Sequence, residues 1–253
     1  MMRSNATRLG AVIRKELTEF RRNRFIMSTM GLLSVIYLVA PTAEILAAKA
    51  SAPSAQLHNR IGLSLLFLLM IPVFLPSTIA AYSVVGERAQ GTLEPLLTTP
   101  IRRTELLIGK AAAALLPAIG LAYGLFGIFL AVVHFGANAV VAAAVWHAPE
   151  LLAEVVFIPL LAAWAIWVGL GISSRVSDVR VAQQLSMLAS LPPIALTSLM
   201  SFQVITPTFA LGALLAGGLL VVDCGACFLV SRLFDRERLI TGSTPRAGLT
   251  SRR

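Results

Sequence analysis

The residue that most invites a chemical role is an acid inside an apolar run. Asp223 lies within the stretch LLVVDCGACFLV. A charge at the centre of a membrane helix costs roughly 2.5 to 3.5 kcal/mol, so Asp223 needs a partner or water. A proton, ion or substrate contact is one interpretation, and an acid hydrogen-bonded between packed helices is the other. The sequence leaves both open, and Asp223 is a possible intramembrane polar site.

Two other groups of potential ligands lack the partners that redox or metal chemistry needs. Cys224 and Cys227 form a C-x-x-C without a βαβ context or a second Cys/His pair, so we expect them to be packing residues. A second group comprises three histidines and two glutamates: His58, His134, His147, Glu150 and Glu154. Their spacing matches no ligand pattern of a metal site, so we expect solvated interface residues and no bound metal.

The stretch GERAQGT at 86–92 has two glycines five positions apart, as a phosphate-binding loop does. Such a loop also needs Lys and then Ser or Thr after the second glycine, because the lysine neutralises the β and γ phosphates. Here Thr92 and Leu93 follow Gly91. We therefore expect no ATPase site, no catalytic residue and no bound cofactor in this chain.

The elements that carry these residues are membrane helices. The chain is 57% hydrophobic and only 13% charged over 253 residues, outside the usual range of soluble domains. The strand alternation of an outer-membrane barrel is absent, which predicts an all-α membrane protein. A span needs roughly 20 apolar residues. Six stretches approach that length, about 25–47, 61–85, 111–135, 155–174, 184–200 and 209–231.

The basic residues predict the orientation of these spans. All of the 21 Lys and Arg residues except Lys49 and Arg60 fall on one side of the predicted spans. Positive charge near short loops stays cytoplasmic, so both termini are expected in the cytoplasm. The net charge of +9 is then a topology signal that also attracts anionic lipid, and we expect no nucleic-acid partner.

The N-terminal segment 1–24 is expected to be a cytoplasmic amphipathic helix that is not cleaved. Its apolar residues share one helical stripe, while its basic residues lie elsewhere, so the helix is expected to lie along the membrane surface. The stripe comprises Leu9, Val12, Ile13, Leu17 and Phe20. Basic residues that only fix the topology would explain the charges and leave the stripe unexplained. The other predicted parts are a transmembrane domain at 25–234 and a basic cytoplasmic tail at 235–253.

The cytoplasmic loop at 86–110, GERAQGTLEPLLTTPIRRTELLIGK, is predicted to be a helix, a break and a second helix. Gly91 permits the break, and Thr92 can cap a short helix at about 93–98 in which Pro95 sits in the first turn. Glu94 suits the positive N-terminal end of that helix. Thr99 with Pro100 is a second cap signal, which starts the helix leading into the third span.

Three leucines give the short helix an apolar face on the cytoplasmic side. Leu93, Leu96 and Leu97 have the spacing of one helical face. An exposed apolar face needs a groove that buries it. The groove can belong to a partner protein or to the chain's own N-terminal helix, and the sequence leaves both open.

The loop closely resembles the hallmark of the type 2, export-class ABC transporter permeases, which reads E-R-x-x-G-T-L-E-x-L-L-x-T-P and then E-x-x-x-G-K. The matching residues are Glu87, Arg88, Gly91, Thr92, Leu93, Glu94, Leu96, Leu97, Thr99, Pro100, Glu105, Gly109 and Lys110. IRKEL at 13–17, RRNRF at 21–25, SSRVSDVRVAQQLS at 173–186 and FDRERLITG at 234–242 also agree. The resemblance therefore spans nearly the whole chain.

The resemblance implies a function that composition alone does not give. In this family the loop forms a coupling helix that docks on a cytosolic ATP-binding subunit, which holds ATP and Mg. The implied assembly has two permease copies, as a homodimer or heterodimer, and two ATPase subunits in a bacterial plasma membrane. Glu87, Arg88 and Glu94 become candidates for polar contacts to the ATPase or to the surface helix. The rival hypothesis is a self-sufficient carrier or channel that uses Asp223.

Overall fold

A computed structural model describes residues 2–89, 91, 103–201 and 208–233. These residues form α-helices and contain no strand. The helices are α1 (Met2–Arg22), α2 (Arg24–Leu46), α3 (Ser54–Leu69), α4 (Ile71–Ala89), α6 (Arg103–Gly136), α7 (Ala139–Trp146), α8 (Glu150–Ser173), α9 (Val179–Ala189), α10 (Leu191–Ser201) and α11 (Phe209–Leu233). The predicted all-α class is confirmed.

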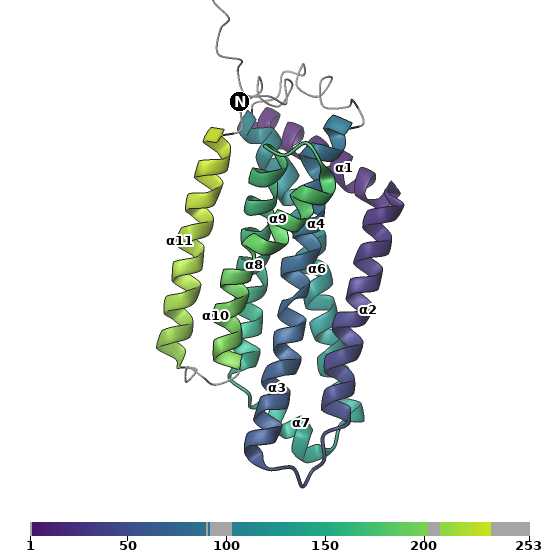
Figure 1. The fold of residues 1–253 in the computed structure, drawn as a ribbon, viewed down its shortest axis with the longest axis vertical. Coiled ribbons are helices and arrows are strands. Elements are labelled where there is room, and N and C mark those ends of the chain that lie inside the picture. Colours follow the sequence, from purple (N-terminus) through teal and green to yellow (C-terminus); the bar gives the residue numbers. More distant parts are fainter. Residues whose placement is uncertain (1, 90, 92–102, 202–207, 234–253) are drawn as a thin grey trace, which may run out of the picture.

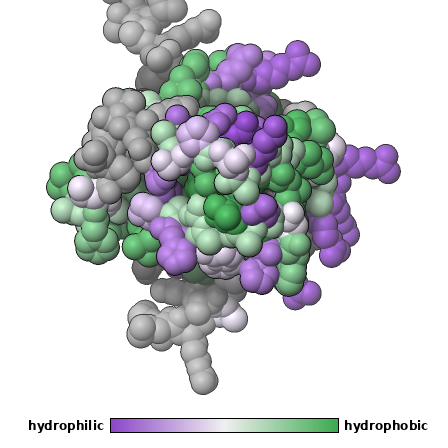
Figure 2. Space-filling model, turned by 90° about the horizontal axis from the view of Figure 1, so that it is seen from below, coloured by the Kyte–Doolittle hydropathy of each residue, from purple (hydrophilic) through white to green (hydrophobic). Residues whose placement is uncertain are grey.

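The long helices run side by side, and two helices mark the ends of the bundle (Figure 1). At one end, called the α1 end below, α1 lies across the bundle beside the last turn of α4 and the first turn of α6. At the other end, the α7 end, lie α7 and the turn between α2 and α3. Hydrophilic and hydrophobic residues are mixed on that end (Figure 2).

Five helical segments of the described chain are long and apolar enough to cross a membrane. They are Ile26–Leu46, Ser54–Arg88, Thr104–Gly136, Glu150–Ser173 and Phe209–Arg232. Each contains or closely overlaps a span predicted from hydropathy. The second is longer than predicted because α3 and α4 follow one another with a break only at Met70.

The structure differs from the prediction at the fifth span. The stretch predicted at 184–200 folds as α9 and α10, each of 11 residues, separated at Ser190. Pro192 and Pro193 are the second and third residues of α10. Proline fits the first turn of a helix and interrupts an interior, so it is tolerated at the start of α10. α9 packs against α4 and α8, and α10 continues from it toward the α7 end, in contact with α3 (Figure 1).

The packing centre of the bundle is α4 against α8. Ala80, Ala81, Val84 and Val85 of α4 are fully buried. Gly169 of α8 allows the close approach, because a Cβ built there would lie 2.7 Å from the Ala80 Cβ. In contrast, α2 and α11 expose many large apolar side chains. Those faces are suited to lipid or to another protein surface.

A serine hydroxyl fixes the same two helices a little nearer the α1 end. Ser173 Oγ, at the end of α8, donates to the Ala81 carbonyl at 2.6 Å and accepts from the Val85 amide at 3.1 Å. It also lies 3.3 Å from the Val84 amide. Ala81 and Val85 stand at i and i+4 of α4, so one hydroxyl contacts both the acceptor and the donor of a single position in the helical hydrogen-bond ladder.

Candidate coupling site

A cluster of charged side chains joins three helices at the two described ends of the loop at 86–110. Its centre is Lys110, in the second turn of α6. Lys110 Nζ lies 2.8 Å from Glu87 Oε2 of α4 and 2.9 Å from Glu16 Oε1 of α1. It also donates to the Ser83 carbonyl at 3.1 Å. A single ammonium group therefore connects both helices that flank the loop to the helix across the bundle end.

A second lysine reinforces the cluster from α1. Lys15 Nζ donates to Glu87 Oε1 at 2.7 Å and lies 3.2 Å from Glu19 Oε1. Burial lowers the pKa of Lys15, but the hydrogen bond to Glu87 and the attraction of the neighbouring carboxylates raise that pKa above its usual 10.5. Lys15 therefore keeps its positive charge throughout the physiological pH range.

Because these ion pairs are buried, their loss would strongly destabilise the fold. Lys110 and Glu16 are each 1% exposed and Glu87 is 7% exposed. A buried charge costs several kcal/mol unless a partner compensates it, so each member needs the others. Glu16, Glu19 and Glu87 bring oxygens within 4.8 Å of one another, as metal ligands can. Here the ammonium groups of Lys15 and Lys110 contact these carboxylates and balance their charge.

Close backbone packing at Gly109 places α1 against α6. A Cβ built at Gly109 would lie 2.6 Å from Val12 Cγ1 and 3.5 Å from Leu9 Cδ1. Any side chain there would therefore push α1 away. Val12 and Phe20 of α1 are buried, whereas Arg8, Arg14 and Arg21 are exposed. The predicted apolar stripe of α1 thus packs at least partly on the protein.

Arg88 ties the start of the loop to the turn between α8 and α9. Its guanidinium donates to the Val176 carbonyl at 3.1 Å and the Ser174 carbonyl at 3.5 Å. Next, Gly91 adopts a φ of +68°, the left-handed region that favours glycine, and its amide donates to the Arg88 carbonyl at 3.1 Å. The break that the sequence predicts at Gly91 is confirmed.

The predicted apolar docking face lies outside the described residues. This holds for Thr92, Leu93, Glu94, Leu96, Leu97, Thr99 and Pro100, and for the tail from residue 234 onward. Of the predicted coupling residues, the structure describes Glu87, Arg88 and Gly91, which lie at the N-terminal end of the loop. Glu87 contacts Lys15 of α1, while Arg88 contacts the α8–α9 turn.

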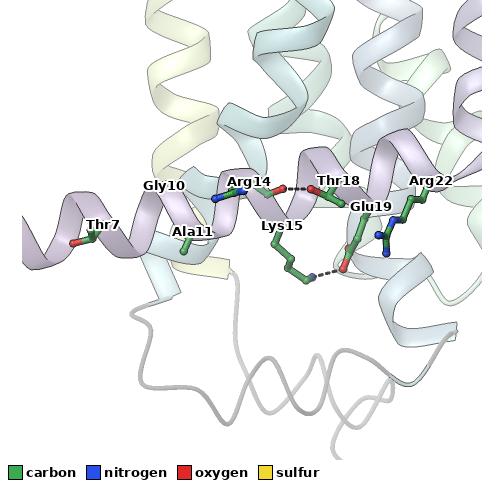
Figure 3. Close-up of a pocket in the computed structure, with 8 residues that line it drawn as sticks. All are labelled: Thr7, Gly10, Ala11, Arg14, Lys15, Thr18, Glu19 and Arg22. Atoms are coloured by element: carbon green, nitrogen blue, oxygen red, sulfur yellow. Dashed lines mark hydrogen bonds and ion pairs between the residues drawn. The ribbon is translucent and has the colours of Figure 1, made fainter.

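The polar flank of α1 borders this site. An open groove along α1 is lined by eight α1 residues, among them Arg14, Lys15, Glu19 and Arg22 (Figure 3). The Lys15–Glu19 ion pair crosses one turn of the helix there. The flank therefore presents both signs of charge beside the loop.

The other residues singled out in the sequence do not form one site. Asp223 is buried on α11, and neither carboxylate oxygen has a hydrogen-bond partner within the described chain. Cys224 and Cys227 are free thiols. His134 packs edge-on to Phe135 and Trp146, and His147 Nδ1 lies 2.8 Å from the Ala143 carbonyl. Only His58 approaches an acid, with Nε2 3.4 Å from Glu150 Oε1.

Sequence reasoning missed two features. It did not join Lys110, Glu16 and Lys15 to Glu87, although the E-x-x-x-G-K motif contains both Gly109 and Lys110. It also expected Glu150 and Glu154 to be solvated, whereas the structure buries both. The sequence contained a signal for this burial, because Glu150 and Glu154 are four residues apart in an otherwise apolar segment and share one helical face.

Comparison with known proteins places this arrangement in a family. A family model described as "ABC-2 family transporter protein" matches residues 12–177, which run from α1 to the α8–α9 turn and contain the entire charge cluster. No curated protein matches the chain. The matched segment is well over half of the 253 residues. The chain belongs to the ABC-2 family of transporter membrane proteins.

Proposed function

We propose that this chain is the membrane-spanning permease of an ATP-driven exporter that contains two permease copies and two cytosolic ATPase subunits. The α1 end faces the cytoplasm, and α9 with α10 completes a sixth crossing, so both termini are cytoplasmic. The location is the plasma membrane of a bacterium. Membership of the ABC-2 family supports a permease without its own ATPase site.

This proposal rests on one observation: both described ends of the loop, at Glu87 and Lys110, contact α1. A loop that transmits force needs stiff attachments, because a flexible hinge would absorb the displacement. Here Lys110 holds α4, α6 and α1 through buried ion pairs, and Arg88 adds the α8–α9 turn. Closure of two ATPase subunits against the loop would move these elements as one unit, with rigid helices carrying the motion into the membrane.

Apolar docking supplies most of the affinity in this mechanism. The leucine face of the predicted helix at 93–98 enters a groove on the ATPase. Exposed ion pairs are individually weak, so the charges along α1 set the register of docking rather than its strength. The groove in Figure 3 runs along α1, the helix that contacts Glu87 and Lys110 at the two described ends of the loop.

The test replaces single residues of the docking helix with glutamate. Leu96→Glu and Leu97→Glu each put a charge into the apolar groove without altering a membrane helix. Losing a buried leucine removes roughly 1.5 to 3 kcal/mol and an unpaired charge adds to that, so ATPase affinity should fall about tenfold or more. The measurement is co-purification of the co-expressed ATPase subunit in detergent, normalised to folded permease.

Thr98→Glu is the matched control, because Thr98 belongs to the same predicted helix but not to its leucine face. It should retain the ATPase near the wild-type ratio. Leu63→Glu, at the far end of the bundle, should also spare docking. Wild-type retention by both leucine variants would show that the loop is not the docking element.

A further inference from the structure

The structure encloses a second distinctive site near the α7 end, a cavity of about 360 Å³ between α3, α8, α10 and α11. Its wall is mostly apolar, with Leu65, Leu69, Phe157 and Ala216 among the lining residues. Two acids of α8, Glu150 and Glu154, also line it. The volume is within the usual range of sites for small organic ligands.

Glu154 is the unusual member of this wall. It is 1% exposed, and neither carboxylate oxygen has a hydrogen-bond partner among the residues that the structure describes. An isolated buried carboxylate is strongly unfavourable, so a residue of this kind is retained where something compensates it. Glu150 lies one helical turn away, and two acids on one helix face repel each other when both are ionised.

The basic groups described near this end leave Glu154 uncompensated. His58 Nε2 approaches Glu150 at 3.4 Å. Arg60 Nη1 is engaged by Glu44 Oε1 at 2.9 Å. Neither group is among the residues that line the cavity, and the same holds for Lys49, His134 and His147 at this end. A cationic group that enters the cavity from outside the described chain would compensate Glu154.

The cavity also has an opening of suitable character. Leu152, Val156 and Phe209 line it and are exposed, so it reaches the flank of the bundle between α8 and α11. That flank is hydrophobic and contacts lipid in the proposed orientation. A ligand arriving there needs an apolar body, whereas a hydrated inorganic ion would find few oxygen ligands on the wall.

We propose that this cavity binds a hydrophobic organic cation, with a protonated amine held by Glu154 and an apolar body packed against α3 and α11. A charge-assisted hydrogen bond satisfies the buried carboxylate, and Glu150 adds negative potential from the next turn. Transport of this ligand class rests on the exporter function proposed above. Binding itself does not, because the cavity is formed by one permease chain.

The test compares two molecules of nearly equal shape. Titration calorimetry on purified permease in detergent uses adamantan-1-ylmethanamine, a compact primary amine, and its alcohol counterpart adamantan-1-ylmethanol. Wild-type permease should bind the amine at least about tenfold more tightly than the alcohol. Saturating amine should also raise the melting temperature, because a ligand that binds only the folded state stabilises it.

Two glutamine variants separate the site from the general charge of this end. Glu154→Gln keeps the shape and removes the charge, so amine affinity should fall about tenfold or more while alcohol affinity stays unchanged. Glu44→Gln removes an acid at the same end that does not line the cavity, and it should bind the amine like wild type. A melting curve for each variant confirms folding.

Equal affinity of wild type for amine and alcohol would overturn the proposal, since the cavity would then be apolar only. No binding of the amine, or wild-type affinity in Glu154→Gln, would overturn it as well. None of these results bears on ATPase docking, which the Leu96→Glu experiment measures separately. The two proposals therefore fail independently.

Discussion

At the scale of single residues, Lys110 and Lys15 show how burial changes the contribution of a lysine charge to stability. Both contact Glu87 and both lie within reach of Glu16. The Lys110 side chain is fully buried, whereas Lys15 keeps about a third of its side chain exposed. Water can therefore replace the partners of Lys15 in part and cannot replace those of Lys110.

Lys110→Met should destabilise the permease strongly. The change leaves Glu16 and Glu87 buried beside one another with one cation fewer, and removing one member of a buried ion pair costs about 3–5 kcal/mol. The measurement is thermal unfolding of the purified permease in detergent. Glu19→Gln is the control, because Glu19 is half exposed and its ion pair with Lys15 should contribute about 0–1 kcal/mol. Equal melting temperatures for Lys110→Met and wild type would contradict a structural role for the cluster.

The motif predicted part of this cluster and not the rest. Glu87 and Lys110 stand in the family pattern, so sequence alone marks them as important. Their meeting depends on how α4, α6 and α1 cross, and no local pattern encodes an encounter between Glu16 and Lys110, which are 94 positions apart. The burial of Glu154 was equally hidden, because hydropathy gives the span but not which face of α8 turns toward a cavity.

At the scale of elements, the close packing of α1 against α6 depends on Gly109 of α6. The sequence predicted the helix and its apolar stripe but assigned the stripe to the membrane surface. Val12 instead lies against Gly109, and Phe20 is also buried in the protein. The fifth span was predicted as one segment, whereas the prolines after Ser190 divide it into α9 and α10. A hydropathy window averages over such a break and does not detect it.

Gly109→Ala should loosen α1 from α6. The new methyl would lie 2.6 Å from Val12 Cγ1, and overpacking of this kind costs about 1–3 kcal/mol. Val12→Ala removes the nearer clashing atom, so the double variant should be more stable than the sum of the single effects predicts. The measurement is thermal unfolding combined with limited proteolysis of α1.

Gly120→Ala provides the matched control on the same helix. A Cβ at Gly120 meets nothing within 4 Å, so this variant should be neutral or slightly more stable than wild type. Additive effects of Gly109→Ala and Val12→Ala would contradict direct contact between α1 and α6.

At the scale of the whole molecule, the exposed apolar faces and the charge distribution support the proposed orientation. α2 and α11 present large apolar side chains outward, as lipid or a second permease copy requires. Lys49 and Arg60 belong to the α7 end, while the other basic residues that the structure describes occur in α1 or near the α1 end of the bundle. This asymmetry is the reason for assigning the α1 end to the cytoplasm.

Cysteine labelling in whole cells tests this orientation. In a background with Cys224 and Cys227 replaced by alanine, Ser51→Cys in the exposed α2–α3 turn should react with an impermeant thiol reagent. Ser243→Cys in the tail should react only after the cells are permeabilised. The reverse pattern would invert the topology and place the loop at 86–110 outside the cell.

The contact of the Ser173 hydroxyl with Ala81 and Val85 lies close to the loop end of α4 and far from the opposite end of α8. If this contact acts as a pivot, the two arms of the lever therefore differ in length. At 1.5 Å per helical residue, this crossing is about 4.5 Å from Arg88, at the start of the loop, counted along α4 from Val85. Along α8 it is about 28 Å from Glu154. If α4 and α8 rotate together about this crossing, a displacement of about 1 Å at Arg88 would accompany a displacement of about 6 Å at Glu154. Spin labels at Arg175 and Leu152 should therefore be displaced by different distances between the nucleotide-free and the ATP-bound complex, and the displacement should be larger at Leu152. Equal shifts would mean that the helices translate without a pivot.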